Sequence, residues 1–358
     1  MKILIVQEYP QPGILDKWFE KAAKIAGLEW GELGHVVIAD RPLGELYGER
    51  EEPVYTKTGK VSKKGKKVRF KTVEFLYRES ELRQRLTGDC PNLIVAAGDA
   101  VFEMLTELRG VYNYRGSVVS GRAGFKVLAV EPPKHGDTLG FWVLVRDLQK
   151  ARREGEFGEI HRTPFESYHD PDHRLEETLT LIEMIGNYSG EPWSLDVETR
   201  AGTLACFGIA QRQEGSMVGF CVPIQTTTGP YWTLEEEWRI WEMLKWSAGR
   251  NRKLVNQNIE YDIYYLLRYG VEPSGVWMDT MLAHSVLYPE LPKSLDFLAS
   301  WYLDNVVYWK SDHRDWTGRT PDEALWEYNV KDAVYTLRIA GEIDGELKRR
   351  GLWDFYHG

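Results

Sequence analysis

The stretch Trp193–Thr199 constrains the fold of this chain most, because it has the pattern of a buried strand whose exit carries two carboxylates. Asp196 and Glu198 are separated by one residue, so their side chains project from the same face of such a strand. Two like charges held that close need a cation between them. In a chain with 54 acidic residues the pair alone is a weak signal, and its weight depends on what else the chain supplies.

Length and charge limit the class of protein. The 358 residues suffice for two domains that each bury a core. The net charge of -9 argues against nucleic-acid binding over the whole surface, but it allows a site where metal ions bridge carboxylates to a phosphate. Apolar runs such as 93–97 are far too short for a membrane span, and the first residues do not form a signal peptide. We therefore expect a cytoplasmic protein without a membrane partner, in the host-cell cytoplasm if the gene is viral.

The three cysteines do not suggest a metal site. Cys90, Cys206 and Cys221 are not spaced as a metal knuckle or as a CxxC pair. Cys206 and Cys221 lie in apolar runs, where a cysteine is usually a small buried hydrophobe.

The first part of the chain alternates apolar strands and amphipathic helices. This pattern predicts strands at 3–6, 93–97 and 125–130 and helices at 14–26 and 100–108. We therefore predict a doubly wound α/β domain over 1–148. Residues 149–187 are charged and interrupted by Gly and Pro, so we expect a linker with one packing helix there, followed by a second domain at 188–358.

A lysine-rich segment lies inside the first predicted domain. Residues 55–71 alternate and are punctuated by glycines, which favours an exposed β-hairpin. A solvated hairpin is the simpler interpretation. The sharper hypothesis is contact with DNA phosphates through Lys63, Lys64, Lys66 and Lys67.

Three segments of the first domain resemble the landmarks of the uracil-DNA glycosylase superfamily. They are 3–10, 93–100 and Arg115-Gly116-Ser117 before the strand at 126–128. The final His-Pro of that family would fall at Glu131-Pro132, where there is no histidine, and the four cluster-binding cysteines of its iron-sulfur branch are missing. The resemblance implies a degenerate, non-catalytic glycosylase-like domain, similar to those that precede some bacteriophage family A polymerases.

The second domain begins with three strands in close succession. Residues 193–199, 203–210 and 217–224 predict an antiparallel meander, followed by a helix at 234–248 and a short strand at 253–255. That short strand leads into Asn256-Gln257-Asn258 and an apolar helix at 263–269.

Two further carboxylates lie four residues after a polar partner. Asn258 and Asp262 share a face once they are helical, as do Tyr328 and Asp332 in a helix predicted over 321–347. Each pair alone is more simply a cap or a solvated face. The order Asp-x-Glu, Asn-x-x-x-Asp and Tyr-x-x-x-Asp along one chain is far more specific.

That ordered triple resembles the DEDD superfamily of 3′-5′ exonucleases, in the branch whose third motif carries Tyr. Asp279-Thr280-Met281 with the segment 294–299 also resembles the region between the second and third motifs of family A polymerase proofreading domains. The resemblance implies an RNase H-like fold with a mixed sheet and two divalent metal ions, Mg²⁺ or Mn²⁺. The polymerase region that follows in family A is absent from the sequence, so a polymerase domain or subunit is an expected partner.

The same resemblance implies a role for each acidic residue. Asp196 would bridge both metals, Glu198 and Asp332 would hold the metal that activates water, and Asp262 would support the second metal. Tyr328 would orient the attacking water. Hard divalent cations prefer oxygen ligands, and two of them can stabilise the attacking and leaving oxygens of a phosphodiester together.

By resemblance, Thr199, Asn258 and Tyr261 are expected to bind the terminal nucleotide of the substrate. The leading hypothesis is a metal-dependent 3′-5′ exonuclease that acts on single-stranded DNA 3′ ends and proofreads for a phage-type family A polymerase. The alternatives are an exoribonuclease and a non-catalytic module that binds DNA or docks a polymerase.

Overall fold

The chain divides into two compact units, 1–162 and 163–358. The computed structural model describes residues 3–7, 15–37, 46–52, 66–89, 91–134, 136–161, 166–168, 174–213, 215–304, 306–310 and 321–358. Each unit has its own sheet and its own hydrophobic core. The boundary at Arg162 falls within the segment 149–187 where the sequence predicts a linker.

The first unit is built on a mostly parallel sheet. Its strand order is β2-β1-β5-β7-β6, with β6 alone antiparallel to its neighbour. The strands are β1 (Ile3–Gln7), β2 (Gly34–Val37), β5 (Leu93–Ala97), β6 (Val118–Ser120) and β7 (Lys126–Val130). The central strands are buried along their whole length, as expected for strands covered on both faces.

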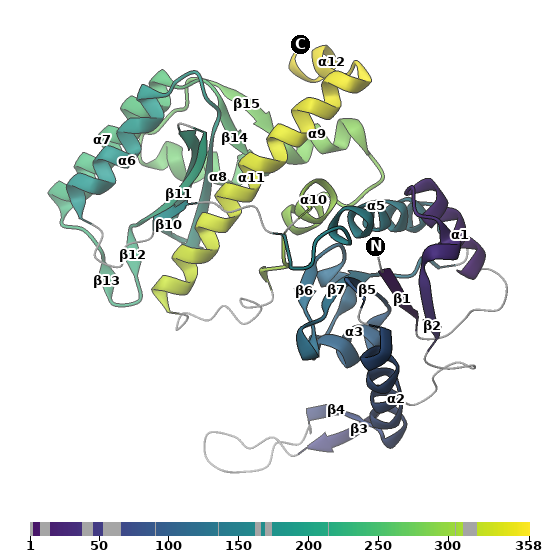
Figure 1. Cartoon of the computed structure of the whole chain (residues 1–358). Helices are drawn as coiled ribbons and strands as arrows, with labels where there is room; N and C mark the ends of the chain where they lie inside the picture. The colour runs from purple at the N-terminus through teal and green to yellow at the C-terminus, as the bar shows by residue number, and fades with distance from the viewer. Residues whose placement is uncertain are drawn as a thin grey trace. The chain divides into compact units, whose positions relative to one another are not determined.

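Helices flank this sheet (Figure 1). They are α1 (Leu15–Ile25), α3 (Asp99–Thr106), α4 (Val111–Tyr114) and α5 (Thr138–Glu154), with short 3₁₀ turns at Trp30–Glu32 and Arg122–Gly124. Helix α5 continues past residue 148, because its buried face extends through Leu144, Leu148 and Ala151. The charged residues at the start of the predicted linker therefore belong to the last turns of this helix.

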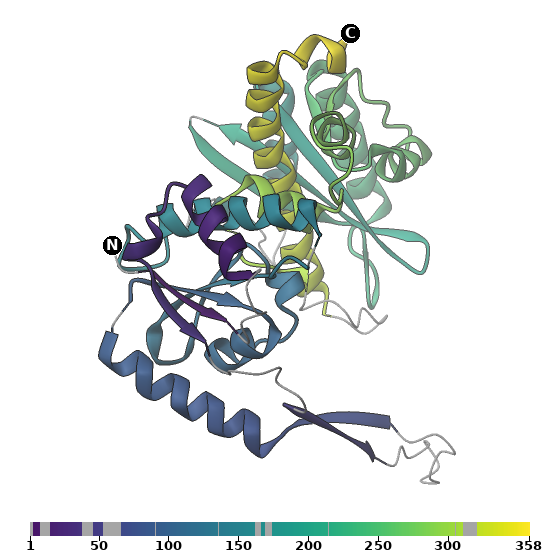
Figure 2. The ribbon, with the colours of Figure 1, turned by 90° about the vertical axis from the view of Figure 1, so that its right-hand side faces the viewer.

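The predicted lysine-rich hairpin has a different first strand. β4 (Lys66–Lys71) pairs in antiparallel register with β3 (Tyr47–Glu52), and α2 (Val73–Asp89) follows it; Figure 2 shows these three elements extending from the sheet. Lys63 and Lys64 lie outside the described residues. Lys66 and Lys67 lie on β4 opposite Glu52 and Glu51.

Among the described side chains, an ion pair joins β3 to β4. The Lys67 Nζ atom lies 3.4 Å from Glu49 Oε2, and both side chains are exposed. Contact of the four lysines with DNA phosphates stays a prediction.

The second unit contains a six-stranded mixed sheet of order β15-β14-β9-β10-β11-β8. Its strands are β8 (Glu166–Tyr168), β9 (Trp193–Arg200), β10 (Thr203–Gln213), β11 (Ser216–Pro223), β14 (Leu254–Asn256) and β15 (Val276–Asp279). β9, β10 and β11 are paired antiparallel, so the predicted meander is confirmed. β14 joins β9 in parallel, and β15 joins β14 in parallel.

Helices α6 and α7 pack together against one face of this sheet, and the long helix α11 crosses the other face (Figure 1). The helices are α6 (Leu175–Asn187), α7 (Leu234–Arg250), α8 (Ile259–Arg268), α9 (Thr280–Leu287), α10 (Leu295–Tyr302), α11 (Asp322–Arg350) and α12 (Trp353–His357). A small hairpin, β12 (Gln225–Thr226) and β13 (Gly229–Pro230), follows β11.

Alternation along β9 assigns its residues to the two faces. Trp193, Leu195 and Val197 are buried in the core formed with α6 and α7. Ser194 points the other way, where its Oγ donates to the Ala333 carbonyl of α11 at 2.7 Å. Asp196 continues the face of Ser194, so the sheet directs its carboxylate towards α11.

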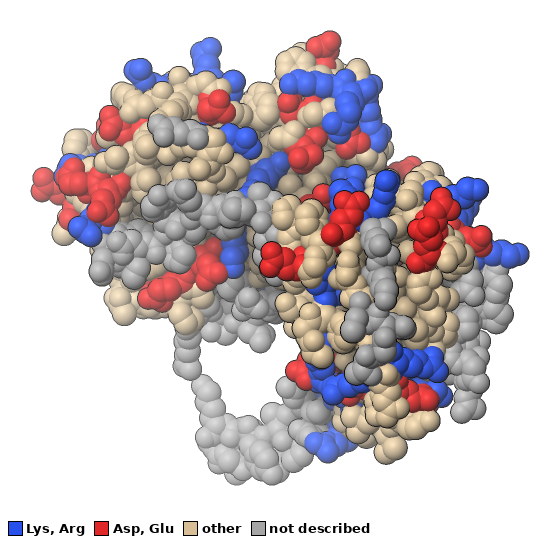
Figure 3. Space-filling model, viewed as in Figure 1, with Lys and Arg blue, Asp and Glu red and all other residues tan. Residues whose placement is uncertain are grey.

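The surface carries both signs of charge. In Figure 3, acidic side chains gather where α6 and α7 begin, which corresponds to Glu176 and Glu177 on α6 and to Glu235, Glu236 and Glu237 on α7. Acidic residues at a helix start stabilise the helix, because their negative charge attracts the partial positive charge of the free N–H groups there. Among the described helices, none combines the length and the apolar character needed to cross a membrane.

Candidate active site

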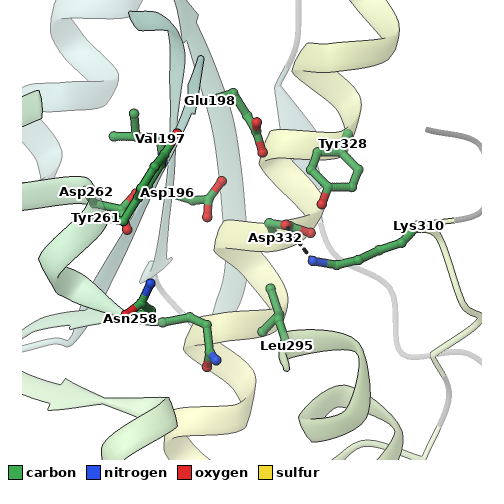
Figure 4. A pocket seen from close by; sticks show the side chains of 11 residues that line it. Asp196, Val197, Glu198, Asn258, Tyr261, Asp262, Leu295, Lys310, Tyr328 and Asp332 are labelled. Atoms are coloured by element: carbon green, nitrogen blue, oxygen red, sulfur yellow. Dashed lines mark hydrogen bonds and ion pairs between the residues drawn. The ribbon is translucent and has the colours of Figure 1, made fainter. Parts of the chain in front are cut away.

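Elements far apart in sequence line one pocket of about 290 Å³ in the second unit. β9, α8, α10, α11 and the segment 306–310 all contribute to it (Figure 4). Its lining residues are Asp196, Val197, Glu198, Gln257, Asn258, Tyr261, Asp262, Leu295, Lys310, Tyr328 and Asp332. The five predicted catalytic residues are therefore brought together, with two of the three predicted nucleotide-binding residues.

Three carboxylates converge in this pocket. Asp196, Glu198 and Asp332 each present an oxygen within 4.8 Å of the other two. The first two leave β9 on the same face, and Asp332 comes from α11, which crosses that face (Figure 4). The i and i+2 spacing on a strand thus places two acids beside a third from a distant helix.

Asp262 enters the pocket from α8 and is anchored to β9. Its Oδ1 accepts the backbone N–H of Val197 at 2.7 Å, and the side chain is 3% exposed. The amide of Asn256 also hydrogen-bonds to this carboxyl, and its Nδ2 donates to the Leu195 carbonyl at 2.7 Å. The backbone N–H of Val197, which lies between Asp196 and Glu198, therefore holds the carboxylate of Asp262 in place.

Asn258 does not share a helical face with Asp262, so that expectation is wrong. Helix α8 begins at Ile259, before the predicted start at 263, and Asn258 is its N-cap in the left-handed region with φ 63°. The carboxylate of Asp279 accepts the N–H groups of Asn258 at 3.2 Å and Ile259 at 3.0 Å. These bonds turn the chain at Asn258, a residue type that tolerates this conformation.

The acids of the pocket hold protons more tightly than ordinary carboxyls. Burial is the main cause, and repulsion between neighbouring carboxylates adds to it for Asp196 and Glu198. The pKa of Glu198 is raised to about 8 and that of Asp262 to about 7, and the pKa values of Asp196 and Asp332 are also raised. Unpaired negative charge is thus costly here, and a bound cation would relieve that cost.

Asp332 is surrounded by donors. Trp309 Nε1 donates to its Oδ1 at 2.5 Å, and Lys310 Nζ donates to its Oδ2 at 3.5 Å. The Tyr328 side chain also hydrogen-bonds to Asp332. Burial raises the pKa of Tyr328, so its phenol is neutral at physiological pH. Figure 4 shows the Tyr328 hydroxyl and the Lys310 ammonium on the same side of the acid cluster.

Lys310 acts as a countercharge to the cluster, which leads to a prediction. Its charge opposes part of the rise in the pKa values of Asp196, Glu198 and Asp332, and the same charge repels a metal cation that enters the site. At pH 8.5 we expect Lys310→Met to tighten Mn²⁺ binding about fivefold, or ~1 kcal/mol, by calorimetry. Lys331→Met is the matched control, because Lys331 pairs with Glu327 outside the pocket. Equal affinity in both variants would contradict this role.

The remaining predicted residues lie on the β9 and α8 side. The hydroxyls of Thr199 and Tyr261 are 3.0 Å apart and hydrogen-bonded. Tyr261 is 45% exposed and lines the pocket, whereas Thr199 lies beside it at the pocket margin. Leu295 on α10 adds an apolar wall across from them (Figure 4). This side of the pocket offers an aromatic ring, hydroxyls and an apolar surface, the groups that contact a nucleoside.

Sequence reasoning missed four residues that hold the site: Asn256, Trp309, Lys310 and Asn329. Lys310 and Trp309 lie more than twenty residues before Asp332, so no local spacing marks them. Asn329 follows Tyr328 directly, and its Nδ2 donates to Asp196 Oδ2 at 2.7 Å. Its position directly after a motif residue is the one feature of the sequence that could have marked Asn329 as part of the site.

The donor set fits hard divalent cations. Three convergent carboxylate oxygens with a fourth acid nearby match the oxygen ligands that Mg²⁺ and Mn²⁺ prefer. Burial and mutual repulsion raise the pKa values of Asp196 and Glu198, so a bound cation would stabilise their charged forms. The described residues near the cluster offer no set of thiolate and imidazole ligands that would favour zinc.

Comparison with known proteins agrees with this chemistry. Residues 174–348 match the family model described as 3'-5' exonuclease. The search of curated proteins found no match. Among solved structures, the catalytic core of RRP6 from Trypanosoma brucei aligns at TM-score 0.39 and 15% identity, over 54% of this chain and 50% of that one. The POL domain of Pol1 from M. smegmatis aligns at TM-score 0.36 and 18% identity, over 53% and 29%.

A structure described as the apo form of a nuclease aligns at TM-score 0.38 and 17% identity, over 55% of this chain and 87% of that one. The chain spans half or less of the RRP6 core and the Pol1 domain. The matched residues include β9, α8 and the part of α11 that carries Tyr328 and Asp332. All four acids of the pocket therefore lie within the match. Residues 174–348 therefore resemble a 3′-5′ exonuclease domain, which supports a nuclease activity for this part of the chain.

Proposed function

We propose that the second unit is a metal-dependent exonuclease that hydrolyses single-stranded DNA from the 3′ end. The observation that carries this proposal is the convergence of Asp196, Glu198 and Asp332 within 4.8 Å, beside Asp262 and Tyr328. This pocket opens next to an aromatic and hydroxyl-bearing surface on β9 and α8. A phosphodiester and its terminal nucleoside therefore have adjacent places to bind.

The acids would hold two divalent metals, with Asp196 shared between them, Glu198 and Asp332 on one and Asp262 on the other. Bound there, the metals supply an activated water and stabilise negative charge on the attacking and leaving oxygens. Tyr328 orients the attacking water, since its neutral hydroxyl can both donate and accept. Trp309 keeps the Asp332 carboxylate in place through its indole N–H. Thr199, Asn258 and Tyr261 bind the terminal nucleotide.

The purpose we propose for this activity is proofreading for a family A polymerase. The family model and the Asp279-Thr280-Met281 segment support it, and so does the resemblance of the first unit to degenerate glycosylase domains. Asp279 in that segment has a structural role, because its carboxylate accepts backbone N–H groups from the start of α8 and from the start of α9. A polymerase domain or subunit would deliver mispaired 3′ ends to the pocket.

Matched DNA and RNA oligonucleotides test the substrate class. With Mg²⁺ present we expect single-stranded DNA to be shortened at least about tenfold faster than RNA of the same sequence. The two substrates differ in the 2′-hydroxyl, so the ratio of the rates measures how the site treats that group. Product ladders from 5′-labelled strands give both rates. Faster RNA hydrolysis would establish an exoribonuclease instead. DNA binding without hydrolysis, retained when all four acids are replaced, would establish a docking module.

A further inference from the structure

Asn329 is completely buried between the acid cluster and two cysteines, and it is the observation on which this inference is built. Its Nδ2 atom lies 2.7 Å from Asp196 Oδ2 and 3.1 Å from the Asp196 carbonyl oxygen. Its Oδ1 atom accepts from Cys221 Sγ at 3.3 Å and from Cys206 Sγ at 3.7 Å. All the hydrogen-bonding atoms of this side chain are therefore engaged.

The partners fix the orientation of the amide. Asp196 presents two oxygens that can only accept when the carboxylate is charged, so the N–H side of Asn329 must face it. The thiols are the donors on the other side, and neither cysteine forms a disulfide. Both thiols lie within reach of Asn329 Oδ1, and a thiol donates through its S–H group. A flipped amide would lose bonds on both sides.

The register of the sheet builds this arrangement. Gly208 on β10 pairs with Asp196 on β9 and with Cys221 on β11, so the three residues form one row across the face that α11 covers. A Cβ at position 208 would lie 2.7 Å from both the carbonyl oxygen and Oδ1 of Asn329. The glycine thus leaves the space that Asn329 fills, directly above the row.

We propose that Asn329 is a positioning residue for Asp196, held in its working orientation by the thiols of Cys206 and Cys221. The inference rests on the proposed function, because it gives Asp196 the central place in the metal site. The Asn329 N–H takes one lone pair of Asp196 Oδ2 and stops rotation of the carboxylate. The remaining lone pairs then face Glu198 and Asp332, where a cation would bind.

Calorimetric titration of Mn²⁺ into the DNA-free full chain tests this role without measuring hydrolysis. Asn329→Leu keeps the approximate size of the side chain and removes both polar groups, and we expect Mn²⁺ affinity to fall at least about tenfold, as for other residues that orient metal ligands. Asn187→Leu is the control, because Asn187 is an exposed asparagine on α6 of the same unit. Circular dichroism verifies that each variant is folded.

The cysteines provide a second, milder test. Cys221→Ala removes the nearer donor, and we expect a loss of about threefold in Mn²⁺ affinity, in line with one lost neutral hydrogen bond. Cys221→Ser supplies a hydroxyl donor and should recover most of that loss. This pair decides the question even if Asn329→Leu does not fold.

The outcomes separate this inference from the proposed function. Wild-type Mn²⁺ affinity in folded Asn329→Leu, or equal affinity in the Ala and Ser variants of Cys221, would overturn the positioning role and leave the exonuclease assignment intact. A wild-type protein that binds Mn²⁺ but does not shorten DNA or RNA, together with weaker binding by Asn329→Leu, would reject the function and keep the positioning role.

Discussion

Asp262→Asn and Asp196→Asn should each reduce the release of nucleotides from a 3′ end at least about 10³-fold while the protein stays folded. Both substitutions keep the shape of the side chain and remove its charge, so the pocket retains its packing. In the Asp262→Asn variant, the new amide oxygen could still accept the Val197 N–H that now goes to Asp262 Oδ1. What is lost is the negative charge that holds the metals.

Glu260→Gln is the matched control for this experiment. Glu260 lies on the same helix as Asp262 but is exposed, so loss of its charge should leave the rate within about twofold of wild type. Initial rates on labelled single-stranded DNA, with unfolding curves for each variant, provide the measurement. An Asp262→Asn protein that keeps a tenth of the wild-type rate in Mg²⁺ would remove Asp262 from the proposed metal site.

The metal-free protein should become less stable as the pH rises from 6.5 to 8.5. Glu198 and Asp262 have folded-state pKa values of about 8 and about 7, well above their values in an unfolded chain. The folded state therefore binds more protons than the unfolded state in this range, and its stability falls as those protons leave. For these two groups the loss is ~3 kcal/mol between pH 6.5 and 8.5.

Urea unfolding in EDTA at both pH values measures this effect, and Mg²⁺ is the contrasting condition. A metal that neutralises the cluster should remove most of the pH dependence, and Glu198→Gln should flatten it without metal. The range begins at 6.5 because His284, whose pKa burial lowers to about 4, contributes mainly below the unfolded pKa of a histidine, and its remaining contribution above pH 6.5 has the opposite sign and is small. Stability that is constant or rises with pH in EDTA would show that the acids are not crowded and buried as described.

Local patterns predicted much of the second unit. Residues 193–199, 203–210 and 217–224 are largely apolar segments of strand length in close succession, and this pattern predicted the β9-β10-β11 meander. Helix α11 was predicted to within a few residues of its observed ends. Helix α2 was not predicted, because many of its residues are charged and only Phe75, Leu82 and Leu86 mark its buried side.

The sequence predicted only those residues of the site that lie at a regular strand or helix spacing from one another. Asp196 and Glu198 share a strand face, and Tyr328 and Asp332 share a helix face, so short-range geometry pairs them. Lys310 and Asn329 reach the cluster through tertiary packing, which no spacing records. Asn258 was predicted to share a helical face with Asp262 and does not. The carboxylate of Asp279, which is distant in sequence, accepts the Asn258 N–H and holds the chain in a left-handed conformation there.

The most direct test of the account is a time course of single-stranded DNA carrying a label on its 3′-terminal nucleotide, incubated with the full chain in Mg²⁺ and in EDTA. We predict that labelled mononucleotide is the first product in Mg²⁺, that none forms in EDTA, and that Asp196→Asn releases none in either condition. Release of label in EDTA, or first products longer than one nucleotide, would contradict a metal-dependent exonuclease that begins at the 3′ end.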